Sequence, residues 1–150
     1  PKLLAKHVPQ HIFRAYDIRG VVTDELTTEV VHDIALAIGS EAQAQGESDI
    51  VVVRDGRLSG PALSQALING LRESGCNVHD IGVVPTPLVY FATHTFGVNS
   101  GVMLTGSHNP PNYNGLKTVI KGKTLTETTI QSLYERIKTQ NLKTPPQKKA

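Results

Sequence analysis

The sequence predicts an α/β fold of three layers, in which helices pack on both faces of a mainly parallel, mixed sheet. Two observations carry this prediction. Segments with a helical period of apolar residues alternate along the chain with short β-branched runs. Hydrophobic residues make up 39% of 150 positions, which is enough apolar material for one core.

The helical segments show apolar residues recurring on one side. We expect helices over residues 25–46, 59–75, 86–97 and 126–140. In the first, Leu26, Val30 and Ile34 share one face, and Gly46 is a suitable stop. Ser59 is a candidate cap for the second helix.

The β-branched runs lie between these helices. We expect strands over residues 49–56, 77–84, 100–107 and 115–120. The run "DIVVVRDG" is typical of a strand that is covered on both faces. Residues 11–22 and 115–120 could add antiparallel pieces to the sheet. Ligands of such folds bind beyond the carboxyl ends of the strands, where "VVVRDGRLSG" and "GVMLTGSHNP" would lie.

Composition argues against several classes of partner. A net charge of +2 and the absence of Trp favour neither nucleic-acid binding nor base stacking. No apolar run approaches the roughly 18 residues that cross a bilayer, so we expect no membrane partner. The single cysteine, Cys76, cannot form an internal disulfide; it suits a reducing compartment such as the cytoplasm and is expected to be buried.

The stretch "GVMLTGSHNPPNYNGLK" contains the main candidates for catalytic and binding residues. Ser107, His108 and Asn109 stand in a loop rich in Gly, Asn and Pro, whose hydroxyls, amides and backbone suit a phosphate ester. Adjacent side chains in extended backbone point apart, so Ser107 and His108 are a poor nucleophile–base pair, and no G-x-S-x-G elbow occurs. Lys117 is either a surface lysine or, if partly desolvated, a group that exchanges a proton.

Other polar residues leave both structural and functional interpretations open. Arg54, Asp55 and Arg57 could line a cleft, or could make salt bridges around an Asp-Gly turn. His7 and His11 have a spacing that would suit a metal on a helix, yet no Cys or carboxylate cluster accompanies them.

Four segments in order resemble the α-D-phosphohexomutases, the phosphomannomutase/phosphoglucomutase family. "TGSHNPPNYNGLK" resembles the phosphoserine loop of that family, and "FRAYDIRGVV", "VVVRDGRLSG" and "GVVPTPLVYFA" match further motifs. The resemblance spans about residues 12 to 137 and implies the first domain of such an enzyme. We therefore expect a domain over residues 1–138 and a linker or tail over residues 139–150, leading toward a second domain.

The resemblance implies a role for each matching residue. Ser107 would carry a phosphoryl group between hexose 1-phosphate and hexose 6-phosphate, through a bisphosphorylated sugar, with His108 and Asn109 lining its site. Lys117 would act as general acid or base. Tyr16 and Arg19 would contact substrate.

The family also implies parts that this sequence does not contain. A phosphohexomutase has four domains, and its Mg²⁺ would be held by phosphorylated Ser107 together with aspartates from another domain. We therefore expect this chain alone to be inactive. Two alternatives are a non-catalytic module that binds phosphate or a partner, and a serine hydrolase, which a serine-directed acylating probe would reveal.

Overall fold

The computed structural model of the protein describes residues 3–5, 7–14, 17–22, 24–56, 60–84, 100–105, 112–140 and 142. The strands are β1 (Ile18–Val21), β2 (Asp49–Arg54), β3 (Asn77–Val83), β4 (Gly101–Leu104), β5 (Tyr113–Ile120) and β6 (Lys123–Thr124). The helices among these residues are a 3-10 turn, η1 (Gln10–Ile12), and three α-helices, α1 (Thr28–Ala44), α2 (Gly60–Glu73) and α4 (Glu127–Thr139).

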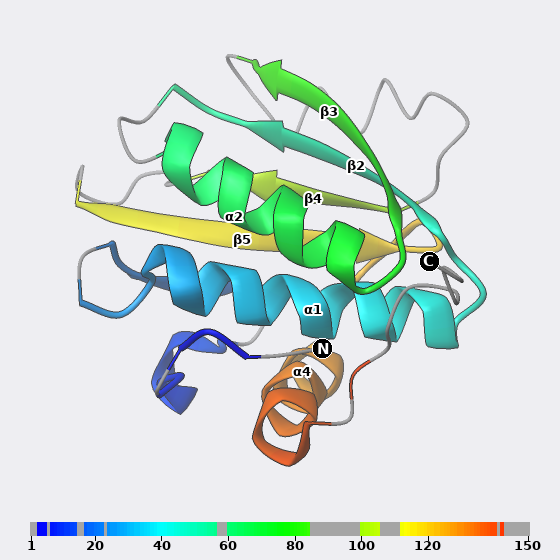
Figure 1. Cartoon of the computed structure of the whole chain (residues 1–150), viewed down its shortest axis with the longest axis horizontal. Helices are drawn as coiled ribbons and strands as arrows, with labels where there is room; N and C mark the ends of the chain where they lie inside the picture. Colours follow the sequence, from blue (N-terminus) through cyan, green and yellow to red (C-terminus); the bar gives the residue numbers. More distant parts are fainter. Residues whose placement is uncertain are drawn as a thin grey trace, which may run out of the picture.

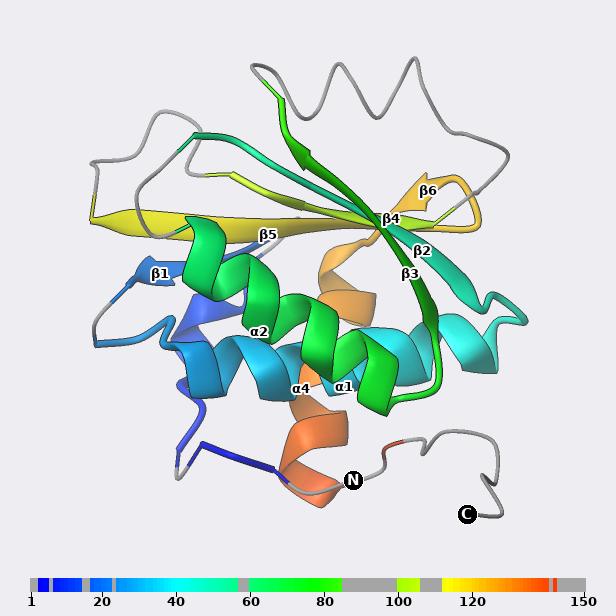
Figure 2. The same ribbon diagram turned by 45° about the horizontal axis from the view of Figure 1, so that its top comes forward.

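The strands form one mixed sheet in the order β1-β5-β4-β2-β3, and β6 pairs with β5 (Figure 1 labels β2 to β5, and Figure 2 also labels β1 and β6). The pairings β2–β3 and β2–β4 are parallel, whereas β5 runs antiparallel to β1, β4 and β6. Every strand except β5 therefore points the same way. The predicted fold class is confirmed, and so are the antiparallel pieces near the start of the chain and at residues 115–120.

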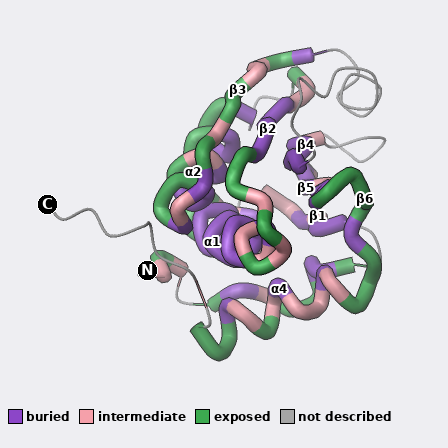
Figure 3. Tube along the Cα trace, turned by 90° about the vertical axis from the view of Figure 1, so that its right-hand side faces the viewer, coloured by how far each residue is buried: buried purple, intermediate pink, exposed green. Residues whose placement is uncertain are grey.

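The three described α-helices lie along one face of the sheet (Figure 2). The main hydrophobic core lies between them and that face, and α1 is its centre, in contact with both α2 and α4 (Figure 3). A smaller cluster occupies the opposite face of the sheet and consists of Val51, Val53, Val84, Met103 and Val119. The helix predicted over residues 86–97 lies outside the described residues.

Helix α1 starts later than the apolar pattern predicts. The Thr27 hydroxyl accepts a hydrogen bond from the Val30 N–H at 3.2 Å, which caps the helix and makes Thr28 its first residue. Leu26 thus lies before the helix, although it is fully buried. At the other end the helix finishes at Ala44, two residues before Gly46, whose φ of +87° suits a chain reversal.

The last helix, α4, completes the helical layer that covers the main core. Thr126 caps α4, and its residues Ile130, Leu133 and Ile137 are buried in the core at helical spacing, with Tyr134 partly buried beside them. Tyr134 packs edge to face on Phe13, with ring centroids 5.4 Å apart. This contact joins α4 to the segment that leads into β1.

Two expectations about single residues are settled by the fold. Cys76 is 5% exposed, as predicted, and burial raises the pKa of its thiol. His7 does not lie on a helix, because the 3-10 turn covers only Gln10–Ile12. The spacing of His7 and His11 therefore does not place them on one face of a helix, as a metal site there would require. Within the described ranges, no three His, Cys, Asp or Glu side chains gather as metal ligands.

Candidate active site

Three charged side chains converge where β1 meets β5. The Asp17 carboxylate oxygen Oδ2 accepts a hydrogen bond from Arg19 Nη2 at 2.7 Å and lies 3.4 Å from Lys117 Nζ. The Asp17 side chain is only 8% exposed, whereas those of Arg19 and Lys117 are 31% and 26% exposed. A shielded carboxylate thus holds two partly exposed cations.

The sheet register explains this meeting. Ile18 pairs with Leu116 and Arg19 with Gly115, so one step back along the same register sets Asp17 opposite Lys117. Side chains alternate between the faces of a strand, and Ile18 and Leu116 belong to the core beneath the helices. The three charged residues therefore lie on the opposite face of the sheet.

A row of residues crosses the sheet beside these charges. The N–H of Thr105 donates to the carbonyl of Gly115, the partner of Arg19, at 3.0 Å. The Thr105 hydroxyl donates to Asp55 Oδ2, also at 3.0 Å. The row Arg19–Gly115–Thr105–Asp55 follows the carboxyl ends of β4 and β2, the edge at which ligands of such sheets bind. Asp55 thus joins the site edge through a hydrogen bond, while Arg57 lies outside the described residues.

Gly115 of β5 permits the close approach of β1 to β5. A Cβ atom at Gly115 would lie 2.8 Å from the carbonyl oxygen of Ile18 and 3.4 Å from that of Thr105. Both neighbours are backbone atoms, which cannot move without displacing a strand. The absent side chain is therefore a condition for Arg19 and Asp17 to lie beside Lys117.

Glu25 holds the turn after β1. Its carboxylate accepts the Val21 N–H at 2.9 Å and also contacts His11. The backbone hydrogen bond from Val21 and, next, the hydrogen bond with His11 hold the pKa of Glu25 below its ordinary value. This contact closes the turn that follows the strand carrying Arg19.

The structure brings together two of the six predicted site residues, Arg19 and Lys117. The other four lie outside the described residues: Tyr16, Ser107, His108 and Asn109. The described chain ends at Thr105 and resumes at Asn112, whose carbonyl accepts the Val22 N–H at 2.8 Å. Sequence reasoning missed Asp17, although its place two residues before Arg19, on the same side of an extended strand, was a usable signal.

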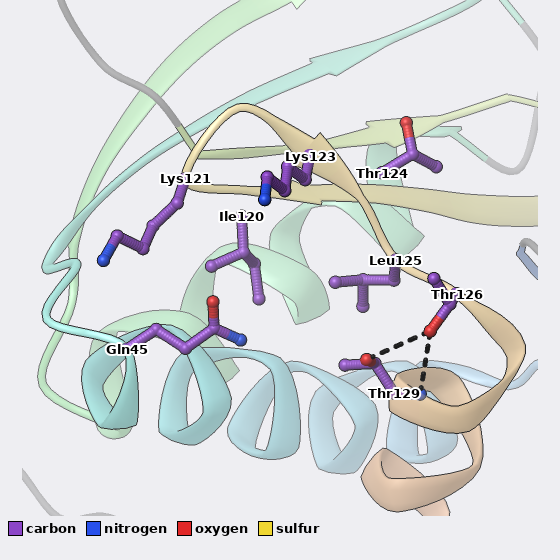
Figure 4. A pocket seen from close by; sticks show the side chains of 8 residues that line it. All are labelled: Gln45, Ile120, Lys121, Lys123, Thr124, Leu125, Thr126 and Thr129. Carbon is purple, nitrogen blue, oxygen red and sulfur yellow. Dashed lines mark hydrogen bonds between the residues drawn. The ribbon is translucent and has the colours of Figure 1, made fainter.

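A cavity lined by described residues lies elsewhere. It has a volume of about 430 Å³ and is bordered by Lys121, Lys123 and the N-terminus of α4 (Figure 4). These residues follow β5 at its carboxyl end, which adjoins the amino end of β4 because the two strands are antiparallel. The cavity is therefore at the opposite edge of the sheet from Arg19, Thr105 and Asp55.

The fold and this edge of the sheet together indicate a class of protein, namely α/β proteins that bind an anionic ligand. A mixed α/β sheet that presents two cations and a threonine hydroxyl beside a Gly- and Asn-rich connection is suited to receive an anionic group. None of the described helices combines the length and apolar character that a membrane crossing requires.

Comparison with known proteins identifies the family. The model of "Phosphoglucomutase/phosphomannomutase, alpha/beta/alpha domain I" matches residues 10–144, and the chain belongs to this family. It is 58% identical over 142 residues to the phosphomannomutase/phosphoglucomutase of Pseudomonas syringae pv. tomato, covering 95% of this chain and 30% of that protein. It is 47% identical over 130 residues to a phosphoglucomutase of Neisseria meningitidis serogroup B, covering 87% of this chain and 28% of that protein.

A solved structure agrees with the sequence comparison. The crystal structure of a phosphoglucomutase/phosphomannomutase family protein from Burkholderia thailandensis superposes with a TM-score of 0.86 at 48% sequence identity. The match covers 93% of this chain and 32% of that one. The chain therefore spans about 30% of the length of the relatives it matches.

Proposed function

We propose that this chain works as the first domain of a longer phosphohexomutase, which interconverts hexose 1-phosphate and hexose 6-phosphate of mannose or glucose. One observation carries the proposal: Arg19 and Lys117 share one carboxylate beside the sheet edge from which the Ser107 motif departs. Membership of the phosphoglucomutase/phosphomannomutase family supports it.

In this proposal Ser107 is the residue that carries the phosphoryl group. Ser107 is only two residues along the chain from Thr105, and His108 and Asn109 follow it. In one half reaction a sugar hydroxyl oxygen bonds to phosphorus as the bond from phosphorus to Ser107 Oγ breaks, which gives a sugar bisphosphate. In the other half reaction Ser107 takes back the second phosphoryl group. Each half reaction breaks one P–O bond and forms one.

The two described cations have separate roles in this scheme. Lys117 exchanges the proton of the sugar hydroxyl, which is lost when the oxygen attacks and regained when it departs. Arg19, with Tyr16, binds the substrate, because a guanidinium can hold phosphate oxygens with two parallel hydrogen bonds. Both side chains are partly exposed, as groups that meet a ligand must be.

The family further implies Mg²⁺, with hexose 1,6-bisphosphate as intermediate and activator. The described residues do not fit a complete metal site, since they contain no cluster of three ligating side chains. We therefore propose that phosphorylated Ser107 supplies one ligand and that aspartates of another domain supply the rest. The cytoplasm is the compartment that we propose for the enzyme.

A non-catalytic phosphate- or partner-binding module of the same fold is the main alternative. Such a module has no need of a paired lysine beside a serine loop. The retention of Arg19, Ser107 and Lys117 together favours the enzyme.

The test is the phosphorylation and mutation of Ser107 in the full-length protein. Peptide mass spectrometry should find a phosphoryl group on Ser107, and Ser107→Ala should lower mutase turnover by orders of magnitude, since nothing else carries the group. The matched control is Ser48→Ala, an exposed serine before β2 that should leave turnover unchanged. Near-normal activity of Ser107→Ala would refute the proposed function.

A further inference from the structure

We propose that Asp17 is a positioning residue of this site, which orients Arg19 and keeps Arg19 and Lys117 side by side. The proposal rests on the proposed function, because it assigns to Asp17 a role in the same phosphoryl transfer. Its basis is that both cations contact the same carboxylate oxygen, Oδ2, at 2.7 and 3.4 Å.

The two contacts differ in strength. A separation of 2.7 Å is typical of a charge-assisted hydrogen bond, whereas 3.4 Å exceeds the usual hydrogen-bond range and leaves mainly Coulomb attraction. Asp17 therefore fixes the direction of Arg19 but restrains Lys117 only loosely. This difference suits the proposed roles, because Arg19 must hold a ligand in place whereas Lys117 must reach a hydroxyl and exchange a proton.

The backbone fixes Asp17 itself. Its carbonyl accepts the Arg14 N–H at 2.9 Å, and its neighbour Ile18 is paired with Leu116 in the sheet and bridged to Phe13. A side chain that is 8% exposed on such a support has little freedom. Asp17 can therefore hold the partly exposed guanidinium of Arg19 in a fixed position relative to the sheet.

The sign of the Asp17 charge shows what the residue contributes. A carboxylate repels a phosphate, so Asp17 weakens the attraction that Arg19 and Lys117 exert on an anionic substrate. It offsets this cost by cancelling the repulsion between the two cations and by fixing their arrangement. Removing its charge should therefore lower turnover without weakening substrate binding, because a displacement near 1 Å can cost about 100-fold in rate.

A double-mutant cycle in the full-length enzyme tests this inference. Asp17→Asn keeps the shape of the side chain and removes its charge; we expect kcat to fall about 10- to 100-fold while KM stays equal or decreases. In an Arg19→Ala background the same change should cost less than about twofold, because Asp17 acts through Arg19. The matched control is Asp49→Asn, an exposed carboxylate at the opposite end of β2 that should leave both constants unchanged.

Two results would overturn the role of Asp17. One is a kcat of Asp17→Asn within twofold of the wild type. The other is a loss that persists in full in the Arg19→Ala background, which would mean that Asp17 acts through stability or through another residue. If Asp17→Asn lowers the melting temperature but leaves kcat normal, the role of Asp17 is also refuted.

A second readout separates this inference from the proposed function. In protein labelled with ¹⁵N-arginine, the Arg19 Nε–H signal, assigned by its loss in Arg19→Lys, should shift or broaden in Asp17→Asn. An unchanged signal refutes the positioning role even if the wild type proves inactive as a mutase. Inactivity of the wild type combined with a shifted signal refutes only the proposed function.

Discussion

Asp17 and Asp33 are both buried carboxylates, yet their partners give them opposite tasks. Asp33 is fully buried and accepts the backbone N–H groups of Leu4 and Ala5, each at 2.8 Å, as well as a contact from His32 at 2.9 Å. Backbone partners make Asp33 an anchor for the start of the chain. Asp17 instead binds two side chains that extend toward solvent, so it organises a surface that a ligand can reach.

Glu25 gives a prediction about acid stability. Because folding lowers the pKa of Glu25, its charge stabilises the folded chain above the ordinary carboxyl value of about 4.5, and this contribution is lost as pH falls below that value. Glu25→Gln should therefore be less stable than the wild type near neutrality, and the difference in free energy of unfolding should shrink between pH 5 and about pH 3.

Urea denaturation of the 150-residue chain at several pH values measures this difference. Glu135→Gln is the matched control, because Glu135 is exposed on α4 and its side chain has no described role in the fold. A difference between Glu25→Gln and wild type that stays constant across the acid range would contradict the assigned role.

Helices α1 and α2 pack closely because glycines form their contact. A Cβ atom at Gly70 of α2 would lie 2.4 Å from the carbonyl oxygen of His32 and 2.6 Å from Ala35 Cβ, both on α1. A Cβ atom at Gly39 of α1 would lie 1.8 Å from Ser74 Oγ. No helix pattern in the sequence reveals such a contact, because it depends on which faces meet.

We expect Gly70→Ala to destabilise the chain by roughly 1–3 kcal/mol, even though alanine is the better helix former. The added methyl group must push α1 and α2 apart, since the atom it meets first belongs to the backbone. Gly56→Ala is the control, because a Cβ atom at Gly56 meets nothing within 4 Å. Urea midpoints measure both, and equal stability of the two variants would show that the helices separate at no cost.

The elements that sequence could predict are those with a strong local pattern. The apolar period predicts α1, α2 and α4, and the β-branched run at Val51 predicts β2. The cap at Thr27 and the short strand β6 were missed, because the cap depends on a side-chain hydrogen bond and the strand on backbone pairing, and neither leaves an apolar period. The meeting of Asp17 with Lys117 depends on strand register across the sheet, which single-sequence patterns do not contain.

At the scale of the whole molecule, the described residues contain a main core between the helices and the sheet, but only part of a site. We expect residues 1–150 to unfold cooperatively and to show no detectable conversion of hexose 1-phosphate to hexose 6-phosphate, because we propose that the remaining ligands of the metal and the sugar come from other domains. Binding of a sugar phosphate should be weak, on the order of millimolar, since few contacts remain to offset lost translational freedom.

A melting curve, a coupled mutase assay and a sugar-phosphate titration of the 150-residue chain measure these three properties. The full-length protein is the positive control for turnover. Robust turnover by the short chain would mean that the site is complete within it and that the multidomain proposal is wrong.

The position of β5 has a consequence for biosynthesis. Among the described strands β1 pairs only with β5, and the residues whose charges meet there, Asp17 and Lys117, are 100 positions apart in sequence. On the ribosome, β1 therefore emerges long before the strand that holds it in the sheet. Helices α1 and α2 and strands β2, β3 and β4 can assemble first, because their contacts are closer in sequence. Arg19 and Lys117 are consequently brought together only after residues 113–120 have left the exit tunnel. This pair of cations is therefore among the last parts of the domain to be assembled during translation.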